Sequence, residues 1–401
     1  MTNLWTPLFS LAVFALIFGV GDYISNKTKG LISTIVVGCL IYLVGFWTGV
    51  IPTESLTSTN MPAMMSSFGI ALMITNLGTM IDLEDLLREW KTVVIAIVGL
   101  VGLAVGSFTV GVWLFGRVYS LAAASPISGG IIAGIITNEY AVAANRPEIG
   151  GFAMLLVGFQ MFIGMPITSF ILKKEANEML KSGNLIKGQS TKRKFINIKC
   201  IPDMPKSMQT DTIYIAKLAI VAAFAAFIAE FTIIPGSKPV NYILNPNIAY
   251  LIFGILFTEL GFLDKHSLSK AGSMGILMLG LISILPGSLA SITPKVFMEM
   301  LYPIIGTLVL GAIFISIFSI IMGKILGYSP RISIAIGLTA MVAYPGTQII
   351  TEEVVKGLDA TEEEKKAIMD NFLPKMLVGG FATVTIASVV FAGIVAPYIF
   401  K

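Results

Sequence analysis

The sequence has little charge. Only 12% of its 401 residues are Asp, Glu, Lys or Arg, about half the share found in soluble proteins. Hydrophobic residues make up 55%, and the mean hydropathy is +0.86. Too few charges remain to cover a soluble surface. These values exclude a soluble enzyme, a disordered protein and a disulfide-stapled secreted domain, and they indicate a membrane protein.

Histidine and cysteine are also scarce. The chain has one histidine, His266, and two cysteines, Cys39 and Cys200. These cannot assemble a His/Cys metal site, an iron–sulfur cluster or a cysteine redox centre, so no cofactor is expected. The sequence contains no HExxH and no GxxxxGK[ST] motif, so neither an enzyme nor an ATP-driven pump is expected. The net charge of +4 is no evidence for nucleic acid binding, and no nucleic acid partner is expected.

Long apolar runs recur along the whole chain. The first residues, MTNLWTPLF, lack the basic region of a signal peptide and are expected to begin the first span. Each apolar segment is close to the length of about 20 residues that a span needs. We place twelve segments, at 5–23, 31–52, 62–81, 92–116, 125–145, 150–172, 212–234, 246–263, 273–292, 302–326, 330–350 and 374–399.

Two of these segments are interrupted by polar or helix-breaking residues. Segment 125–145 contains Gly129-Gly130 and the polar run Thr137-Asn138-Glu139-Tyr140, and segment 330–350 contains Tyr344-Pro345-Gly346-Thr347-Gln348. Proline breaks a helix, and non-helical backbone at membrane depth survives only inside protein or beside a water-filled cavity. We interpret both as re-entrant hairpins that return to the same side. A kinked ordinary span remains the alternative.

The basic residues give the orientation. Segment 173–211 carries nine of them and should be cytoplasmic, because cytoplasmic loops are rich in Lys and Arg. With two non-crossing hairpins there are about ten crossings, and both termini are external. This topology puts all basic residues inside except Arg117, Arg146, Lys238, Lys295 and Lys401.

The two halves of the chain resemble each other in the order of their segments. Each half has five crossings and one hairpin, and an odd number of crossings inverts the second copy. Ser-Pro opens both hairpins. The expected fold is an all-α polytopic membrane protein built as an inverted repeat. Its parts are a first repeat at 1–172, a basic cytoplasmic linker at 173–211 and a second repeat at 212–401.

Polar residues within the apolar segments are the candidate ion ligands. A charge at the bilayer centre costs roughly 2.5–3.5 kcal/mol, so Glu139 should meet a cation, a proton or a partner. Na⁺ is a hard cation that takes oxygen ligands. The expected ion-binding residues are Thr75, Asn76, Thr137, Asn138, Glu139 and Thr339, with Na⁺ at Thr137, Asn138 and Glu139. A loop cap at Glu139 and bonding between helices at Thr75 and Asn76 remain alternatives.

The hairpins also supply the candidate substrate ligands. Unwound backbone and half-helix N-termini can bind a carboxylate, and glycine lets a ligand approach the backbone closely. The expected substrate-binding residues are Ser128, Gly129, Tyr140, Gly346, Thr347 and Gln348. A plain loop at 344–348 is the alternative. Gln160, within another span, is expected to hydrogen-bond between helices.

A charged stretch precedes the last span. DATEEEKKAIMDN (359–371) offers Asp359 and Thr361 as N-caps and places Glu before Lys at helical spacing. It is expected to form a short separate helix in the cytoplasm.

Four stretches, in their order along the chain, resemble the bacterial sodium/glutamate symporter family. They are LGTMIDLEDLLREWK (77–91), the Gly/Ser-rich first hairpin, the Pro-Gly-Thr second hairpin, and FLPKMLVGGFATVTIASVV (372–390). The chain departs from the family at 135–140, which stands where the family has a Ser-Gly-Gly-His-Gly tract. The resemblance implies an elevator mechanism, a homodimer formed through the first two spans of each half, and the inner membrane of a bacterium.

The leading hypothesis is a secondary transporter that couples Na⁺ to the symport of a small carboxylate, such as a glutamate-like amino acid or an organic acid. The expected partners are this substrate and membrane lipid. A proton-coupled carrier or a cation/proton antiporter is the alternative, with Glu139 as the titrating acid. A channel is a further alternative.

Overall fold

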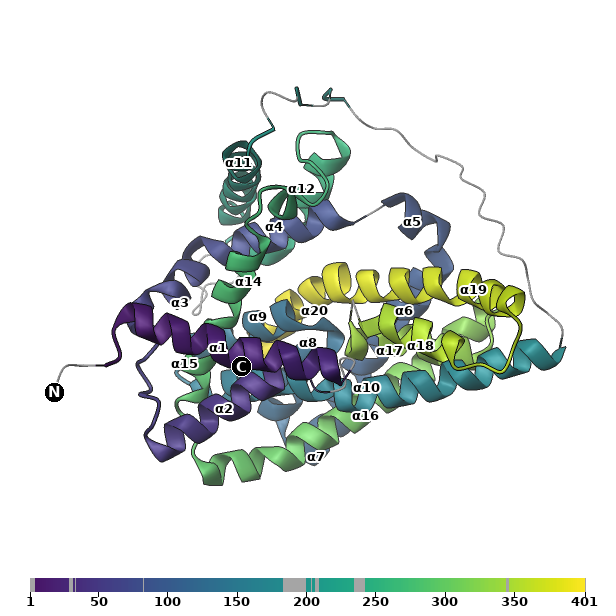
Figure 1. Ribbon diagram of the computed structural model, residues 1–401, viewed down its shortest axis with the longest axis horizontal. Helices are drawn as coiled ribbons and strands as arrows, with labels where there is room; N and C mark the ends of the chain where they lie inside the picture. The colour runs from purple at the N-terminus through teal and green to yellow at the C-terminus, as the bar shows by residue number, and fades with distance from the viewer. Residues whose placement is uncertain are drawn as a thin grey trace.

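The computed structural model is an assembly of α-helices (Figure 1). It describes residues 4–28, 32, 34–81, 83–182, 200–202, 204–205, 209–233, 242–343 and 346–400. These described residues contain no β-strand; a single isolated β-bridge joins Ile233 and Tyr242. The structure therefore confirms the expected all-α class for the part of the chain that it describes.

The helices follow the apolar segments of the sequence. The helices up to residue 182 are α1 (Pro7–Lys27), α2 (Thr34–Thr48), α3 (Met61–Met64), α4 (Ile70–Met80), α5 (Leu83–Arg88), α6 (Trp90–Gly106), α7 (Val112–Phe115), α8 (Arg117–Gly129), α9 (Ile131–Ala143) and α10 (Pro147–Ser182). Those that follow are α11 (Asp211–Glu230), α12 (Pro246–Glu259), α13 (Ser267–Lys270), α14 (Met274–Ile282), α15 (Ile284–Leu289), α16 (Pro294–Leu326), α17 (Pro330–Val342), α18 (Gly346–Lys356), α19 (Glu362–Phe381) and α20 (Ser388–Val395).

Short non-α turns continue several of these helices. Three π-helical turns, η2 (Met65–Gly69), η3 (Ser107–Gly111) and η5 (Ala382–Ala387), join α3 to α4, α6 to α7 and α19 to α20. Two 3₁₀ turns, η1 (Thr57–Thr59) and η6 (Ala396–Tyr398), lie before α3 and after α20.

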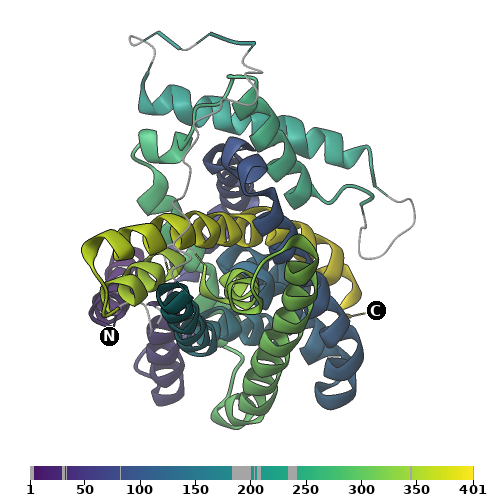
Figure 2. The same cartoon turned by 90° about the vertical axis from the view of Figure 1, so that its right-hand side faces the viewer.

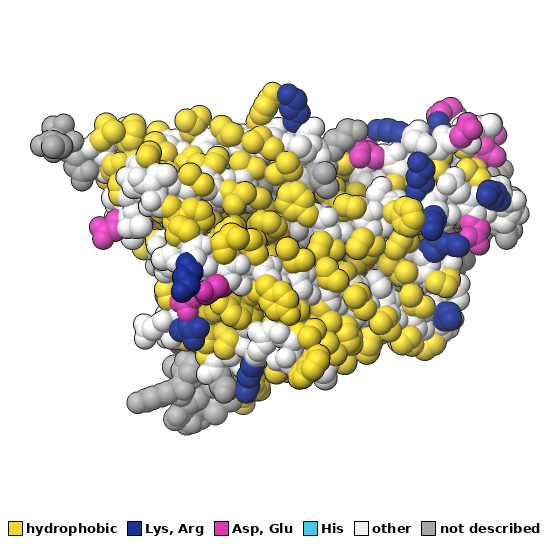
Figure 3. Space-filling model, turned by 90° about the horizontal axis from the view of Figure 1, so that it is seen from below, with side chains coloured by type: hydrophobic (Ala, Val, Ile, Leu, Met, Phe, Trp, Pro, Cys, Tyr) yellow, Lys and Arg dark blue, Asp and Glu magenta, His cyan; other side chains and the backbone are white. Residues whose placement is uncertain are grey.

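Seven helices among the described residues are long and apolar enough to cross a membrane. They are Pro7–Ser25, Met61–Met80, Trp90–Phe115, Pro147–Ser182, Asp211–Glu230, Pro294–Leu326 and Glu362–Tyr398. Large hydrophobic side chains such as Trp113 and Ile325 are exposed on their surfaces. Figure 3 shows hydrophobic side chains over the middle of one face, with many of its charged side chains gathered at the right-hand end. Such an apolar surface suits contact with lipid, so the chain is a multi-pass membrane protein.

Two pairs of short helices lie among the long ones (Figure 1). α8 and α9 form the first pair, and they pack against α10 and α20. α17 and α18 form the second pair, and they pack against α10 and α19. α8 also contacts α17, so the two pairs touch each other.

α11 and α12 lie side by side (Figure 2). α12 crosses α4, and a glycine on each helix brings the two backbones together. A Cβ at Gly78 would lie 2.6 Å from the backbone nitrogen of Ile255, and one at Gly254 would overlap the carbonyl oxygen of Thr75. Only residues without a side chain permit this approach.

One expectation about the charged stretch is wrong. Residues 359–371 do not form a separate helix, because α19 begins at Glu362 and continues through Pro374 into the last span. Thr361 is its N-cap, in a capping box with Glu364. The proline removes one backbone hydrogen bond. The buried stripe Ile368, Phe372 and Met376, at a spacing of four residues, holds the helix together on both sides of it.

Two boundaries also differ from those expected. The first hairpin begins at Arg117 rather than 125, because the Ala-rich stretch 121–124 is buried and favours helix. α10 runs to Ser182, so the first ten residues of the expected linker 173–211 continue that helix. Residues 183–199 of the linker lie outside the described residues.

Candidate functional site

The first hairpin turns at two glycines. Gly129 has φ +154° and Gly130 has φ +87°, conformations that residues with a side chain rarely adopt. Gly129 also has no room for a side chain, since an added Cβ would lie 2.8 Å from the Thr383 carbonyl oxygen. Ser128, buried in the last turn of α8, donates a hydrogen bond to the Ser125 carbonyl oxygen at 2.7 Å. The tip of this hairpin is therefore seated directly on η5.

The second hairpin turns after α17, where Ala343 has φ +58°. Tyr344 and Pro345 lie outside the described residues. Gly346 begins α18, and Thr347 is buried next to it. Gln348 is partly exposed, and its Nε2 donates a hydrogen bond to Glu352 Oε1 at 2.9 Å. This bond holds the pKa of the Glu352 carboxyl below its ordinary value.

Both hairpins meet the same stretch of the last helix, residues 379–388. The first hairpin contacts it through Gly129, which faces Thr383 and Ser388. The second contacts it through Thr339 and Thr347. A Cβ at Gly379 would lie 3.2 Å from Thr339 Oγ1, and one at Gly380 would lie 3.1 Å from Thr347 Oγ1.

A π-helical turn occupies this stretch, at η5. π-Turns inside α-helices occur frequently at functional sites. Five of the expected ligands thus belong to two broken helices that converge on η5 and the turn before it. They are Ser128, Gly129, Thr339, Gly346 and Thr347. Thr339 Oγ1 already donates to the Ile336 carbonyl oxygen at 2.6 Å.

Several buried oxygen atoms in this region have no hydrogen-bond partner among the described residues: Ser125 Oγ, Gln160 Oε1 and Thr347 Oγ1. Gln160 lies one helical turn before Gly164, where a Cβ would lie 2.9 Å from Met341 Cβ on α17. The expectation that Gln160 bonds between helices is therefore wrong for its oxygen atom. Unpartnered buried oxygens are costly, and they are the ligands that a hard cation takes.

The expected sodium ligands Thr137, Asn138 and Glu139 do not converge. They are successive residues of the regular helix α9, so their side chains point about 100° apart. Thr137 Oγ1 donates to the Ala133 carbonyl oxygen at 3.0 Å, and Asn138 packs against Gly150 of α10.

Glu139 and its neighbour Tyr140 face a separate cavity of about 370 Å³. At 1.5 Å per residue, Glu139 lies about 13 Å along α9 from Gly130. Tyr140 is therefore also removed from the hairpin tip, and its hydroxyl accepts a hydrogen bond from Asn245 Nδ2 at 3.3 Å.

Thr75 and Asn76 lie at the crossing of α4 with α12, away from the hairpin tips. Thr75 Oγ1 donates to the Ala71 carbonyl oxygen at 2.8 Å. Asn76 Oδ1 accepts from the backbone nitrogen of Leu268 at 2.9 Å, which ties α4 to α13. These hydrogen bonds match the alternative in which Thr75 and Asn76 bond within and between helices.

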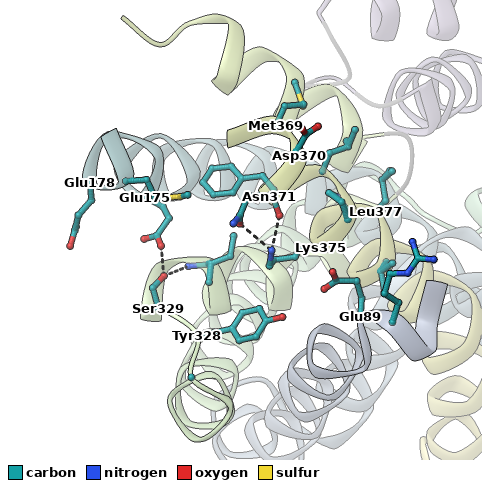
Figure 4. Close-up of a pocket in the computed structure, with 18 of the residues that line it drawn as sticks. Glu89, Glu175, Glu178, Tyr328, Ser329, Met369, Asp370, Asn371, Lys375 and Leu377 are labelled. Atoms are coloured by element: carbon teal, nitrogen blue, oxygen red, sulfur yellow. Dashed lines mark hydrogen bonds between the residues drawn. The ribbon is translucent and has the colours of Figure 1, made fainter. Parts of the chain in front are cut away.

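A larger cavity of about 1090 Å³ lies between α10, α17 and α19 (Figure 4). Its lining residues on α19 extend to Val378, which directly precedes Gly379 and the stretch that both hairpins contact. In it Lys375 Nζ donates to Asn371, and Ser329 bonds to Glu175. Tyr328, between α16 and α17, also lines it, and burial raises the pKa of this phenol above its ordinary value. It is therefore a neutral hydrogen-bonding group near pH 7.

From the sequence, Thr383, Thr385 and Ser388 in this stretch are expected either to back the second hairpin or to bond to carbonyls of their own helix. In the structure Thr383 Oγ1 donates to the Gly379 carbonyl oxygen at 2.9 Å and Ser388 Oγ to the Val384 carbonyl oxygen at 2.6 Å.

The sequence did not indicate that the first hairpin meets the same stretch, residues 379–388. Its signal in the sequence is the pair Gly379-Gly380 beside Thr383, which is also the pattern of ordinary helix packing. Within the described residues, no three His, Cys, Asp or Glu side chains cluster as metal ligands would.

In comparisons with known proteins, no protein-family model and no curated protein matches the chain.

Proposed function

We propose that the protein is a secondary active transporter that couples Na⁺ to the symport of a small carboxylate. The observation that carries this proposal is the meeting of two broken helices at residues 379–388. Discontinuous helices that face each other inside a bundle are typical of secondary transporters. The cavity lined as far as Val378 would give a solute access to this point from one side.

The proposed architecture is an inverted repeat of ten crossings and two hairpins. It is supported by the order of helices, which is the same in 7–182 and 211–398: two helices, a broken third, a long fourth, two short ones and a long last one. The packing is also reciprocal. α8 packs on α16 and α20, whereas α17 packs on the corresponding α6 and α10. The seven long helices and the shorter α2, α12 and α14–α15 would be the ten crossings.

The hairpin tips suit an anion and a hard cation together. α9 begins at Ile131 and α18 at Gly346, so two helix N-termini, with their free N–H groups and positive dipole ends, lie at the tips. These would bind the carboxylate. The unpartnered oxygens of Ser125, Gln160 and Thr347 would contribute to the sodium site.

The likeness to sodium/glutamate symporters extends the proposal. On that basis the protein acts in the inner membrane of a bacterium, with both termini external, and a hairpin-bearing domain moves like an elevator against a dimeric scaffold that contains α1 and α2. The substrate class is then a glutamate-like amino acid or an organic acid.

Uptake by proteoliposomes tests the function. Reconstituted protein is expected to accumulate at least one of a panel of amino and organic acids when an inward Na⁺ gradient is imposed. Uptake that follows a pH gradient and ignores Na⁺ would favour the proton-coupled alternative. Saturating rates distinguish a carrier from a channel, which would give single-channel currents.

Thr347→Val tests the site within the same assay. The variant removes an unpartnered hydroxyl, so it should raise the Na⁺ concentration for half-maximal uptake at least about tenfold while the protein stays folded. Thr351→Val is the matched control, because Thr351 is buried on the same helix and its hydroxyl already donates to the Thr347 carbonyl oxygen at 2.7 Å. Equal Na⁺ dependence in both variants would remove Thr347 from the site.

A further inference from the structure

The smaller cavity, of about 370 Å³, lies away from the hairpin tips. It is enclosed by α9, by η2 with the start of α4, and by residues 242–250 at the beginning of α12. These elements are far apart in the sequence, so the cavity exists only because α9 packs beside the crossing of α4 and α12. Its volume is in the lower part of the range of small-molecule sites.

Its chemistry is that of a site for a positive charge. Among the residues that the structure describes, Glu139 is the only charged one that lines the cavity, and none of the lining residues is Lys, Arg or His. Among the described residues, no side chain forms a hydrogen bond or ion pair with the Glu139 carboxylate. The Glu139 side chain is partly buried, and a partly buried carboxylate without a partner favours a ligand that supplies a cation.

Three tyrosines line the same cavity: Tyr140, Tyr242 and Tyr250. Aromatic rings attract organic cations, and phenol oxygens accept hydrogen bonds from ammonium groups. Asn245, which donates to the Tyr140 hydroxyl at 3.3 Å, fixes the position of one of these phenols.

The volume of the cavity favours an organic cation over a bare metal ion as its ligand. A sodium or calcium ion needs several oxygen ligands within about 2.6 Å, and a cavity of this volume with one carboxylate is too wide to supply them from all sides. An organic ammonium ion fills more of the space and uses both the carboxylate and the rings. An anion would lie beside Glu139, and no described residue of the lining would offer it a cationic side chain.

We propose that this cavity binds a small organic cation with one ammonium group, with Glu139 as its counter-ion and Tyr140, Tyr242 and Tyr250 around it. The site is separate from the hairpin tips, and the proposal does not depend on the transported substrate. A ligand there joins α9 to α4 and α12.

Isothermal titration of the purified full-length protein in detergent tests this proposal, with choline and butylammonium as probes. At least one probe should bind saturably in sodium-containing buffer, whereas acetate should not bind in the cavity. Glu139→Gln should weaken that binding at least about tenfold, because it removes the counter-ion. Glu148→Gln is the matched control: Glu148 is paired with Arg146 at the start of α10, outside the cavity, so its loss should leave binding unchanged.

Tyr250→Leu provides a second variant, since it keeps an apolar side chain but removes the ring and the phenol. It should weaken binding several-fold. Thermal unfolding of each variant establishes that it is folded. The proposal is overturned if neither probe binds to the wild-type protein, or if folded Glu139→Gln and Tyr250→Leu both bind as the wild type does.

Discussion

The two hairpins contact the same helical stretch, residues 379–388, but the contacts are of different kinds. The tip of the first is locked by backbone, because Gly129 lies against the Thr383 carbonyl oxygen with no space for a methyl group. At the second hairpin the contact is with a side chain: among the described residues, a Cβ at Gly346 would come within 4 Å of Val342 Cγ1 alone, at 3.0 Å. Contact between backbones cannot relax, whereas a side chain can rotate. The contact at Gly129 is therefore fixed, whereas the contact at Gly346 has room to adjust.

The largest effect is expected at Gly129. Gly129→Ala should destabilise the protein by about 3 kcal/mol or more, because the new methyl group meets the Thr383 carbonyl and φ is +154°. The measurement is the thermal unfolding midpoint of the detergent-solubilised protein. Gly346→Ala is the control and should cost under about 1 kcal/mol, since one flexible side chain can move. Equal losses of stability in Gly129→Ala and Gly346→Ala would show that the two contacts do not differ in this way.

Gly164 of α10 tests how tightly the second hairpin is packed, because it lies against the end of α17. A methyl group there would lie 2.9 Å from Met341 Cβ and 3.3 Å from the Met341 carbonyl carbon. Gly164→Ala should cost about 1–3 kcal/mol, less than Gly129→Ala, because the end of α17 can shift. Unfolding midpoints of both variants, measured side by side, check the order. A greater loss at Gly164 would make the second hairpin the more tightly seated one.

The hairpins also begin differently. The first helix of the first hairpin has no side-chain cap at Gly116, whereas Ser329 caps α17 by accepting from the Ile332 backbone nitrogen at 3.2 Å and bonds to Glu175. Ser329→Ala should therefore cost about 1 kcal/mol, as loss of an N-cap does.

The control is Ser333→Ala, which removes only a hydroxyl that donates to the Ser329 carbonyl oxygen. It should change the unfolding midpoint less than Ser329→Ala. An equal or larger change would mean that the cap does not anchor the second hairpin.

The smallest expected effect is a pH dependence of protein stability. It comes from Gln348 and Glu352 on α18, the helix that follows the turn of the second hairpin. Gln348 lowers the pKa of Glu352, so their hydrogen bond contributes stability above the ordinary carboxyl pKa of about 4.3 and loses it as the pH falls through the lowered value. Gln348→Met should lower the unfolding midpoint by under about 2 °C at pH 7. This difference should shrink as the pH falls through the lowered pKa of Glu352.

Glu352→Gln provides the control for that titration. With no carboxyl at position 352, the effect of Gln348→Met should be the same at pH 7 and in acid. A difference that instead grows in acid would assign the effect to another group.

Much of the fold was predictable because its signals are local. Apolar runs placed the helices, although α10 ends at Ser182 rather than 172 and α16 begins at Pro294 rather than 302, and Gly129-Gly130 and Pro345-Gly346 marked the breaks. The prediction failed at 359–371, where the acidic sequence suggested a separate helix. The packing of Phe372 and Met376 carried α19 through Pro374 instead.

The site was less predictable. The polar run 137–140 attracted attention because polar residues are conspicuous in an apolar sequence, yet it lies on the arm of the first hairpin and not at its tip. Gln160 looked like an interhelical hydrogen-bonding residue, and its oxygen has no partner among the described residues. Sequence spacing says which residues share a helix face, but not what another helix presents to that face.

The sequence by itself determined where the chain is helical and where helices break, because hydropathy and the conformational limits of Gly and Pro act over a few residues. Only the tertiary structure decided that both breaks lie on 379–388 and that Glu139 has three tyrosines around it. Those neighbours come from helices up to about two hundred and sixty residues apart, and packing of whole helices, not local preference, brings them together.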